Sequence, residues 1–146
     1  MKRFLITTAL ESTWCENEPV LFLGEWCRRY SRKNRWLTLD SVVLPYHWDD
    51  RSKFHADYEY LKLLHERLLQ DLTAQLNEIH GVDHSLRYWR ILIGPWLGYF
   101  VQVLFDRWTS IQQAVSRYDL SGTAILASQN GSLVPNDMDD FNQLYI

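Results

Sequence analysis

A histidine and two carboxylates stand together in residues 46–50, which read YHWDD. His47 beside Asp49 or Asp50 could form a general base with the carboxylate that orients its ring. A histidine between Tyr46 and Trp48 is also a common structural hydrogen-bonding group. Carboxylates and aromatic faces suit a sugar, whose hydroxyls need acceptors and whose C–H faces stack on rings. The segment therefore indicates chemistry on a hydroxyl-rich ligand.

Polar groups also follow the other short apolar runs of the chain. Thr8 and Glu11 come after the first run, Glu25 and Trp26 after the second, and residues 128–131 (SQNG) after the fourth. The hypothesis gives the role of base toward an acceptor hydroxyl to Glu11 or Asp49, with His47 as its partner or as a sugar ligand. The predicted binding residues here are Thr8, Glu25, Trp26, Trp48 and Asp50. Caps and turns explain Thr8, Asp49 and Asp50 equally well.

A second polar group lies in residues 80–90. Arg87 and Arg90 are one helical turn apart and could hold a phosphate or carboxylate, although a salt bridge to the preceding helix is an equal alternative. The two histidines of this segment fall on either side of Gly81 rather than on one helical face, which disfavours zinc. We expect no metal and no cofactor.

The elements that would position these residues begin with three short apolar runs, residues 4–7, 20–23 and 41–44, which predict buried strands. Residues 25–36 have the length of a helical crossover, so a βαβ unit and a parallel sheet follow. Residues 9–19 are too few for a good helix, so this connection is expected to be an extended loop. A fourth strand is predicted at residues 123–127, after a break at residues 121–122.

Two long helices are predicted between the third and fourth strands. Apolar residues recur every three or four positions from Asp49 or Asp50, either of which could cap the helix, as far as Gly81. Asp83 could cap the second helix, in which residues 91–105 hold one strongly polar side chain, so it is expected to be mostly buried. Pro95 should kink it or start it afresh. Residues 136–146 resemble a short further helix capped by Asn136 or Asp137.

Together these elements predict an α/β fold, with a small parallel Rossmann-like sheet and a long helical hairpin, as a single domain over residues 1–146. In such open sheets ligands bind beyond the carboxyl ends of the strands, where residues 46–50 and the other polar groups fall.

Composition narrows the class of protein. The chain has 146 residues, of which 47% are hydrophobic, a net charge of −3 and a pI near 5.9, so nucleic acid is not an expected partner. Two cysteines indicate reduced thiols, and without an export signal the expected location is cytoplasmic. Residues 91–105 are too short to span a bilayer. GxGxxG, Walker, CxxC and GxSxG motifs are absent, which disfavours P-loop nucleotide hydrolysis and serine hydrolase chemistry.

Four strings carry a resemblance to a known family: LITTALEST (5–13), VLFLGEWCRRYSRK (20–33), VLPYHWDD (43–50) and GVDHSLRYWRILIGPWLGYFVQVLFDRW (81–108). They resemble the amino-terminal part of bacterial surface-polysaccharide, O-antigen-type, transferases. The resemblance implies the amino-terminal half of a GT-B-like glycosyltransferase, which faces a sugar or glycan acceptor. It implies that a nucleotide-sugar would bind only through a carboxy-terminal domain missing here, so that this fragment would be inactive alone.

Peripheral membrane association and homo-oligomerisation stay open at this point. The alternative from another class is a non-catalytic α/β interaction module, completed by a partner or by oligomerisation through its open sheet edge and its carboxy-terminal helix.

Overall fold

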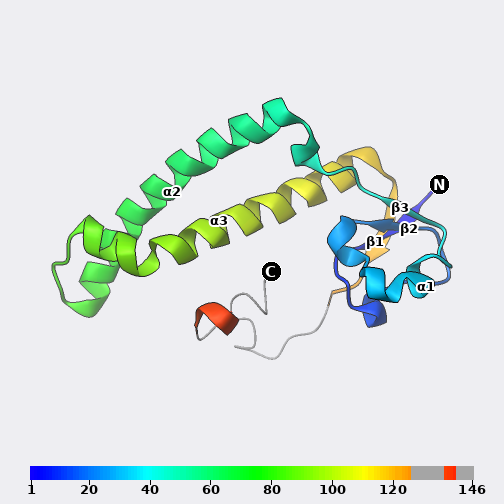
Figure 1. Cartoon of the computed structure of the whole chain (residues 1–146), viewed down its shortest axis with the longest axis horizontal. Coiled ribbons are helices and arrows are strands. Elements are labelled where there is room, and N and C mark those ends of the chain that lie inside the picture. The colour runs from blue at the N-terminus through cyan, green and yellow to red at the C-terminus, as the bar shows by residue number, and fades with distance from the viewer. Residues whose placement is uncertain (126–136, 141–146) are drawn as a thin grey trace. The chain divides into compact units, whose positions relative to one another are not determined.

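The computed structural model describes residues 1–125 and 137–140 (Figure 1). The chain divides into two compact units. The sheet unit comprises Met1–Asp49 and Arg107–Leu133, and the hairpin unit comprises Asp50–Asp106 and Val134–Ile146. The division into compact units does not test the expectation of a single domain, which stays a prediction.

The sheet unit is built on four parallel strands: β1 (Arg3–Ile6), β2 (Val20–Phe22), β3 (Ser41–Val43) and β4 (Leu120–Thr123). Their order is β3-β2-β1-β4, so the chain first moves outward from β1 and later returns to its other side. This confirms the predicted α/β fold with a Rossmann-like parallel sheet. In such sheets the place where the strand order reverses, here between β1 and β4, is where ligands bind.

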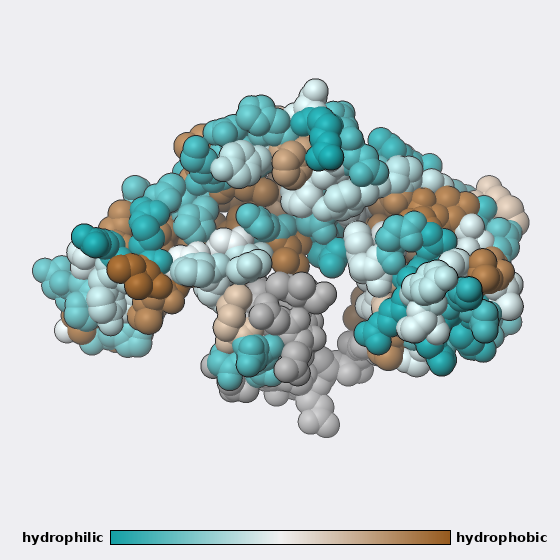
Figure 2. All heavy atoms as spheres, in the orientation of Figure 1, coloured by the Kyte–Doolittle hydropathy of each residue, from teal (hydrophilic) through white to brown (hydrophobic). Residues whose placement is uncertain are grey.

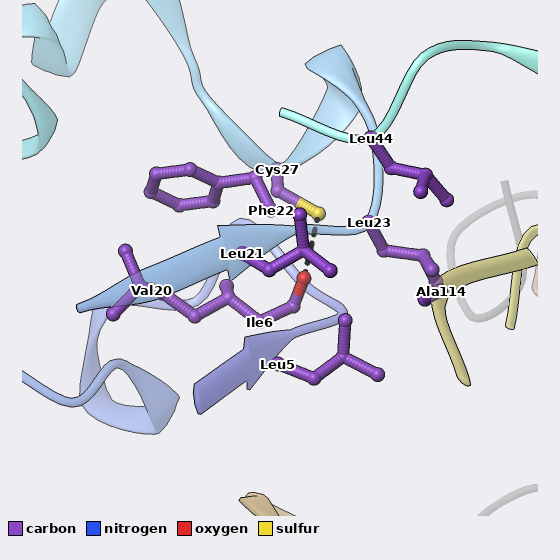
Figure 3. Close-up of a cluster of buried hydrophobic side chains, with 9 residues drawn as sticks. All are labelled: Leu5, Ile6, Val20, Leu21, Phe22, Leu23, Cys27, Leu44 and Ala114. Atoms are coloured by element: carbon purple, nitrogen blue, oxygen red, sulfur yellow. Dashed lines mark hydrogen bonds between the residues drawn. The ribbon is translucent and has the colours of Figure 1, made fainter. Parts of the chain in front are cut away.

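The core of the sheet unit is centred on β2, whose three residues are fully buried. An uninterrupted apolar run is typical of a parallel strand covered on both faces. Leu5, Ile6, Leu23, Cys27, Leu44 and Ala114 complete the cluster (Figure 3). Ala114 comes from α3 (Leu86–Arg117), so the last turns of that helix pack on the sheet.

The fourth strand lies earlier than predicted, at Leu120–Thr123 instead of residues 123–127. Ser121 and Gly122, which were expected to end the preceding helix, are part of this strand, because pairing with β1 outweighs their weak strand propensity. The register shifts between Arg3 and Phe4, and the Thr123 hydroxyl donates to the Leu5 carbonyl at 2.8 Å. Residues 126–127 lie outside the described part of the chain.

The predicted helical crossover at residues 25–36 is wrong as a single helix. It consists of 3₁₀ turns at Glu25–Cys27 and Tyr30–Arg32 and the four-residue helix α1 (Lys33–Trp36). Side chains fold this segment back: the Trp36 indole N–H donates to the Arg29 carbonyl at 3.0 Å, and the Arg28 guanidinium lies 4.8 Å from the Trp36 ring. The connection between β1 and β2 is a loop, as predicted, with a 3₁₀ turn at Glu11–Thr13.

The predicted helical hairpin is confirmed as α2 (Arg51–His80) and α3. Asp50 caps α2, since its Oδ1 accepts from the backbone N–H groups of Ser52 and Lys53 at 2.9 and 3.1 Å. Gly81 ends the helix in the left-handed conformation, with φ of 62°. Of the two carboxylates left open by the sequence, Asp50 is the cap.

The start and the interior of α3 differ from expectation. Asp83 was the predicted cap, but the helix starts two residues beyond the position this requires, and Ser85 Oγ accepts from the Tyr88 N–H at 3.3 Å. The helix continues through Pro95, so no fresh start is made there. It is also not mostly buried, since Ile91, Leu92 and other large apolar side chains are exposed. In the part of the hairpin unit that the structure describes, α2 contacts one side of α3.

The hairpin is closed by the side chain of Asn77. Its Oδ1 accepts from the Trp89 indole N–H at 2.8 Å and from the His84 backbone N–H at 3.1 Å, while its Nδ2 donates to the His84 carbonyl at 2.9 Å. Further along the helices, a His65 ring nitrogen lies 3.0 Å from the Gly94 carbonyl. These contacts tie α2 to α3 and to the turn between them.

At the carboxy terminus, the described residues 137–140 include a contact expected of a helix cap: Asp137 Oδ1 accepts from the Asp140 N–H at 2.9 Å. The other residues of the helix predicted at 136–146, Asn136 included, lie outside the described ranges. Within residues 1–125 and 137–140, neither long helix has an apolar stretch of the length and hydropathy needed to cross a bilayer.

Candidate functional site

The loops that follow β1, β2 and β3 lie at one edge of the sheet, because the three strands are parallel. Backbone bonds keep the strand exits adjacent: the Leu23 N–H donates to the Ile6 carbonyl and the Leu44 N–H to the Phe22 carbonyl, both at 2.9 Å. The thiol of Cys27 also donates to the Ile6 carbonyl at 3.5 Å (Figure 3). We call the predicted residues of these loops the carboxyl-edge site. They are Thr8, Glu11, Glu25, Trp26, His47, Trp48 and Asp49.

Thr8 lies in the loop after β1, where its hydroxyl is used by a turn. Thr13 donates its hydroxyl proton to the Leu10 carbonyl at 2.7 Å, so in the 3.0 Å contact between Thr8 and Thr13 the donor must be Thr8. Thr8 Oγ1 in turn accepts from the Leu10 N–H at 3.1 Å. Its hydroxyl thus organises the loop.

Glu11 is held by two arginines from the crossover after β2. Arg32 donates from Nε at 2.5 Å and from a terminal nitrogen at 2.9 Å, and Arg35 lies 3.3 Å away. The hydrogen bond from Arg32 is the main cause that lowers the pKa of Glu11. A carboxylate with a lowered pKa is a weaker base, so this pairing disfavours Glu11 as a general base.

Trp26 and Glu25 follow β2, and both are engaged. The six-membered ring of Trp26 covers Gly24 so closely that a Cβ there would lie 2.1 Å from it, and the Arg107 guanidinium lies 3.9 Å from the ring centre. The Trp26 indole N–H is buried without an acceptor in the described part of the chain. Glu25 is paired with Arg28 at 2.6 Å. Arg107 and Gly24 therefore occupy much of the surface that Trp26 would offer to a ligand.

His47 lies after β3, in a 3₁₀ turn at His47–Asp49. It is buried, with ring centres of Tyr46 and Trp48 at 5.1 and 4.7 Å. Trp48 is half-buried and Asp49 is exposed. The carboxylate of Asp49 is thus accessible, next in sequence to an aromatic cluster that contains the histidine.

The remaining predicted residues belong to the hairpin unit. Asp50 is the cap of α2, and Arg87 is exposed near the start of α3. Arg90 grips Glu66 of α2 with two nitrogens, at 2.5 and 2.6 Å, and this pairing lowers the pKa of Glu66. Of the two alternatives that the sequence left open for Arg90, the structure has the salt bridge to the preceding helix. Residues 128–131 lie outside the described ranges.

Four residues that shape the site were not predicted: Gly24, Arg32, Arg35 and Arg107. The pairing of Arg32 and Arg35 with the first loop has a signal in the sequence, since residues 11–18 hold three glutamates and residues 28–35 hold five basic residues. Arg107 lies 81 positions beyond Trp26 in the chain, and no local pattern indicates its position over the Trp26 ring.

Three comparisons with known proteins, together with the geometry of the site, bear on the identity of the chain. In residues 1–125 and 137–140, no three His, Cys, Asp or Glu side chains are grouped so as to hold a metal ion. No curated protein and no solved structure matches the chain. A family model described as LIC12162 family transferase matches residues 3–145. The chain, with its four-stranded parallel sheet and polar carboxyl edge, therefore belongs to the LIC12162 family of transferases.

Proposed function

We propose that the chain is the acceptor-side domain of a glycosyltransferase that assembles a cell-surface polysaccharide of the O-antigen type. The observation that carries this proposal is the gathering of carboxylate and aromatic side chains at the carboxyl edge of a parallel sheet. Membership of a transferase family supports it. In this proposal the whole enzyme is GT-B-like, a separate domain binds the nucleotide-sugar, and the present chain alone is inactive.

Asp49 is the better of the two candidate bases. Its carboxylate is exposed, whereas Glu11 is held by Arg32 and Arg35. Asp49 would take the proton of an acceptor hydroxyl, whose oxygen then attacks the anomeric carbon of the donor as the bond to the nucleotide diphosphate breaks. His47 would orient this carboxylate or the sugar, and half-buried Trp48 would offer a ring to the sugar face.

The test is a ¹H–¹⁵N NMR titration of the chain with simple hexoses and, separately, with nucleotide-sugars. We expect hexoses to shift amide signals of residues 7–11, 24–27 and 46–49, and Asp49→Asn to weaken these shifts. Asp40→Asn is the matched control, because Asp40 is an exposed carboxylate just before β3, at the opposite edge of the sheet. Nucleotide-sugar shifts without hexose shifts, or equal effects of the two variants, would contradict the proposal.

A second function, that of a non-catalytic interaction module, is favoured by one observation. Large apolar side chains of the hairpin unit, such as Ile79, Ile91 and Leu92, are exposed. A chain that self-associates or binds a protein but shifts no amide in the presence of sugars would support this function over the first.

A further inference from the structure

One face of α3 is apolar and exposed. Tyr88, Ile91, Leu92, Pro95 and Tyr99 recur at intervals of one, three and four residues, so they share one side of the helix over about 16 Å. Ile91 is 71% exposed, Leu92 59%, Tyr99 53% and Tyr88 44%. Figure 2 shows hydrophobic residues, in brown, at the surface of the hairpin unit. We call these five residues the outer face of α3.

The opposite side of the same helix segment is apolar too, and it is buried. The side chains of Trp89, Leu97 and Val101 are almost inaccessible to solvent. A ring nitrogen of His65, on α2, lies 3.0 Å from the Gly94 carbonyl oxygen on this side. Residues 91–105 contain no Asp, Glu, Lys or Arg. A helix that is apolar on all sides is normally covered on all sides, whereas within the described residues α2 covers one side of this segment. Burial of the outer face against a second surface would therefore be favourable.

We propose that a second copy of the chain covers it, in a weak antiparallel homodimer built on the outer face of α3. This inference does not depend on the glycosyltransferase proposal. The order of residues along the helix supports it: a tyrosine lies at each end and aliphatic residues lie between them, so a twofold rotation places the aliphatic middle of one copy on that of the other. Tyr88 of one copy then lies near the partner's Tyr99, and Leu92 near the partner's Pro95.

Charge favours the antiparallel arrangement over the parallel one. Arg87 is an exposed charged residue at the amino-terminal end of the outer face. Parallel helices would bring the two Arg87 guanidinium groups together, whereas antiparallel helices place them at opposite ends of the interface. Antiparallel pairing also sets the two helix dipoles in opposition.

The size of the face predicts a weak dimer. Its exposed side chains amount to on the order of 400–500 Å², at the upper end of what single proteins leave uncovered. A symmetric pair would bury roughly 1,000 Å² in all, at the low end for specific association, so a dissociation constant on the order of 10 μM or weaker is expected.

The first test is sedimentation velocity over a concentration range of about 5 to 500 μM, which brackets the expected constant. The wild-type sedimentation coefficient should rise with concentration, and Leu92→Asp should abolish the rise. Leu63→Asp is the matched control, since Leu63 is a 65% exposed leucine on α2, outside the outer face. Circular dichroism of each variant checks folding. A wild-type chain that stays monomeric, or equal loss of association in both variants, overturns the proposal.

The second test fixes the orientation by cross-linking with a short bismaleimide in a Cys15→Ser background, where the remaining Cys27 is fully buried. An equimolar mixture of Tyr88→Cys and Tyr99→Cys chains should give a cross-linked dimer that neither chain gives alone. Efficient cross-linking of Tyr88→Cys by itself would indicate parallel helices and overturn the arrangement. Flotation of a monomeric chain with phosphatidylglycerol vesicles, lost in Leu92→Asp, would assign the face to a membrane surface and overturn the dimer.

Discussion

Arg32 grips the carboxylate of Glu11 across 21 positions of sequence, with one nitrogen on each carboxylate oxygen at 2.5 and 2.9 Å. The contact joins the loop after β1 to the crossover after β2. These two segments, each of which was predicted to supply site residues on its own, are therefore joined by ion pairs. Arg35 extends the network, because it contacts both Glu11 and Glu16.

Removal of this contact should change the titration of Glu11. Because Arg32 lowers the pKa of Glu11 in the folded chain, the pairing stabilises the fold above the pKa of the unfolded carboxyl group, and this contribution is lost as pH falls through the folded pKa. Arg32→Gln should raise the pKa of Glu11 and weaken this acid dependence. NMR titration of the carboxyl carbon measures it. Arg29→Gln, at an exposed arginine of the same segment, should leave the Glu11 titration unchanged.

The two cysteines should differ sharply in reactivity. Burial raises the pKa of the Cys27 thiol to about 11, and its side chain is inaccessible, whereas Cys15 is half-buried. With Ellman's reagent near pH 8, the native chain should release one equivalent of thiolate quickly and the second only on unfolding. Cys15→Ser should remove the fast phase. Rapid reaction of both thiols in the native chain would show that Cys27 is not enclosed as described.

Gly24→Ala should destabilise the fold by about 1–3 kcal/mol through overpacking. The new methyl group would lie 2.1 Å from the Trp26 ring, while the backbone, with φ of −177°, suits any residue. The penalty is therefore steric, and in urea unfolding it should largely disappear when Trp26→Leu is added. Gly98→Ala is the contrasting control: its nearest neighbour would be 3.9 Å away, and inside a helix alanine should gain about 0.5–1 kcal/mol.

Asn77→Ala should cost about 1–3 kcal/mol, since it leaves the buried Trp89 indole N–H without its acceptor and opens the turn of the hairpin. The loss is measured by urea unfolding followed by tryptophan fluorescence. Asn34→Ala, at an exposed asparagine in α1, should have little effect. Equal losses would mean that the Asn77 amide does not hold the turn.

The adjacent carboxylates Asp49 and Asp50 should behave differently on substitution. Asp50→Ala removes the acceptor for two backbone N–H groups of α2 and should cost about 0.5–2 kcal/mol. Asp49→Ala removes no cap and should change stability little, while it should affect sugar binding if the proposed function holds. Thermal unfolding followed by circular dichroism separates the two variants.

The first three strands could be predicted to within one residue, because each is a continuous apolar run of the kind that a two-sided parallel sheet requires. The fourth could not, since Ser121 and Gly122 form a strand only through pairing with β1, which is more than a hundred residues away. For the same reason local patterns identified Glu11 and Trp26 as residues at the carboxyl edge but not Arg107, which the topology brings to Trp26.

The position of α3 marks a second limit. Its apolar composition predicted a buried helix, but composition shows only that a surface prefers to be covered, and residues such as Leu92 are exposed in the single chain. For both carboxylates of residues 46–50, the sequence pattern allowed either a helix-capping role or a role in catalysis or binding. The hydrogen bonds of Asp50 identify it as the cap.

The strand order also fixes when the sheet can be completed. β1 pairs on one side with β2, which is close in sequence, and on the other with β4, where Thr123 bonds to Leu5 across 118 positions. Closing so long a loop is slow compared with forming the local contacts of a helical hairpin. During synthesis, β1 therefore remains an edge strand until both long helices have left the ribosome. Until then the backbone N–H and C=O groups along one side of β1 are unpaired and could pair with another chain. Of the four strands, β1 is made first but acquires its second neighbour only when β4 pairs with it.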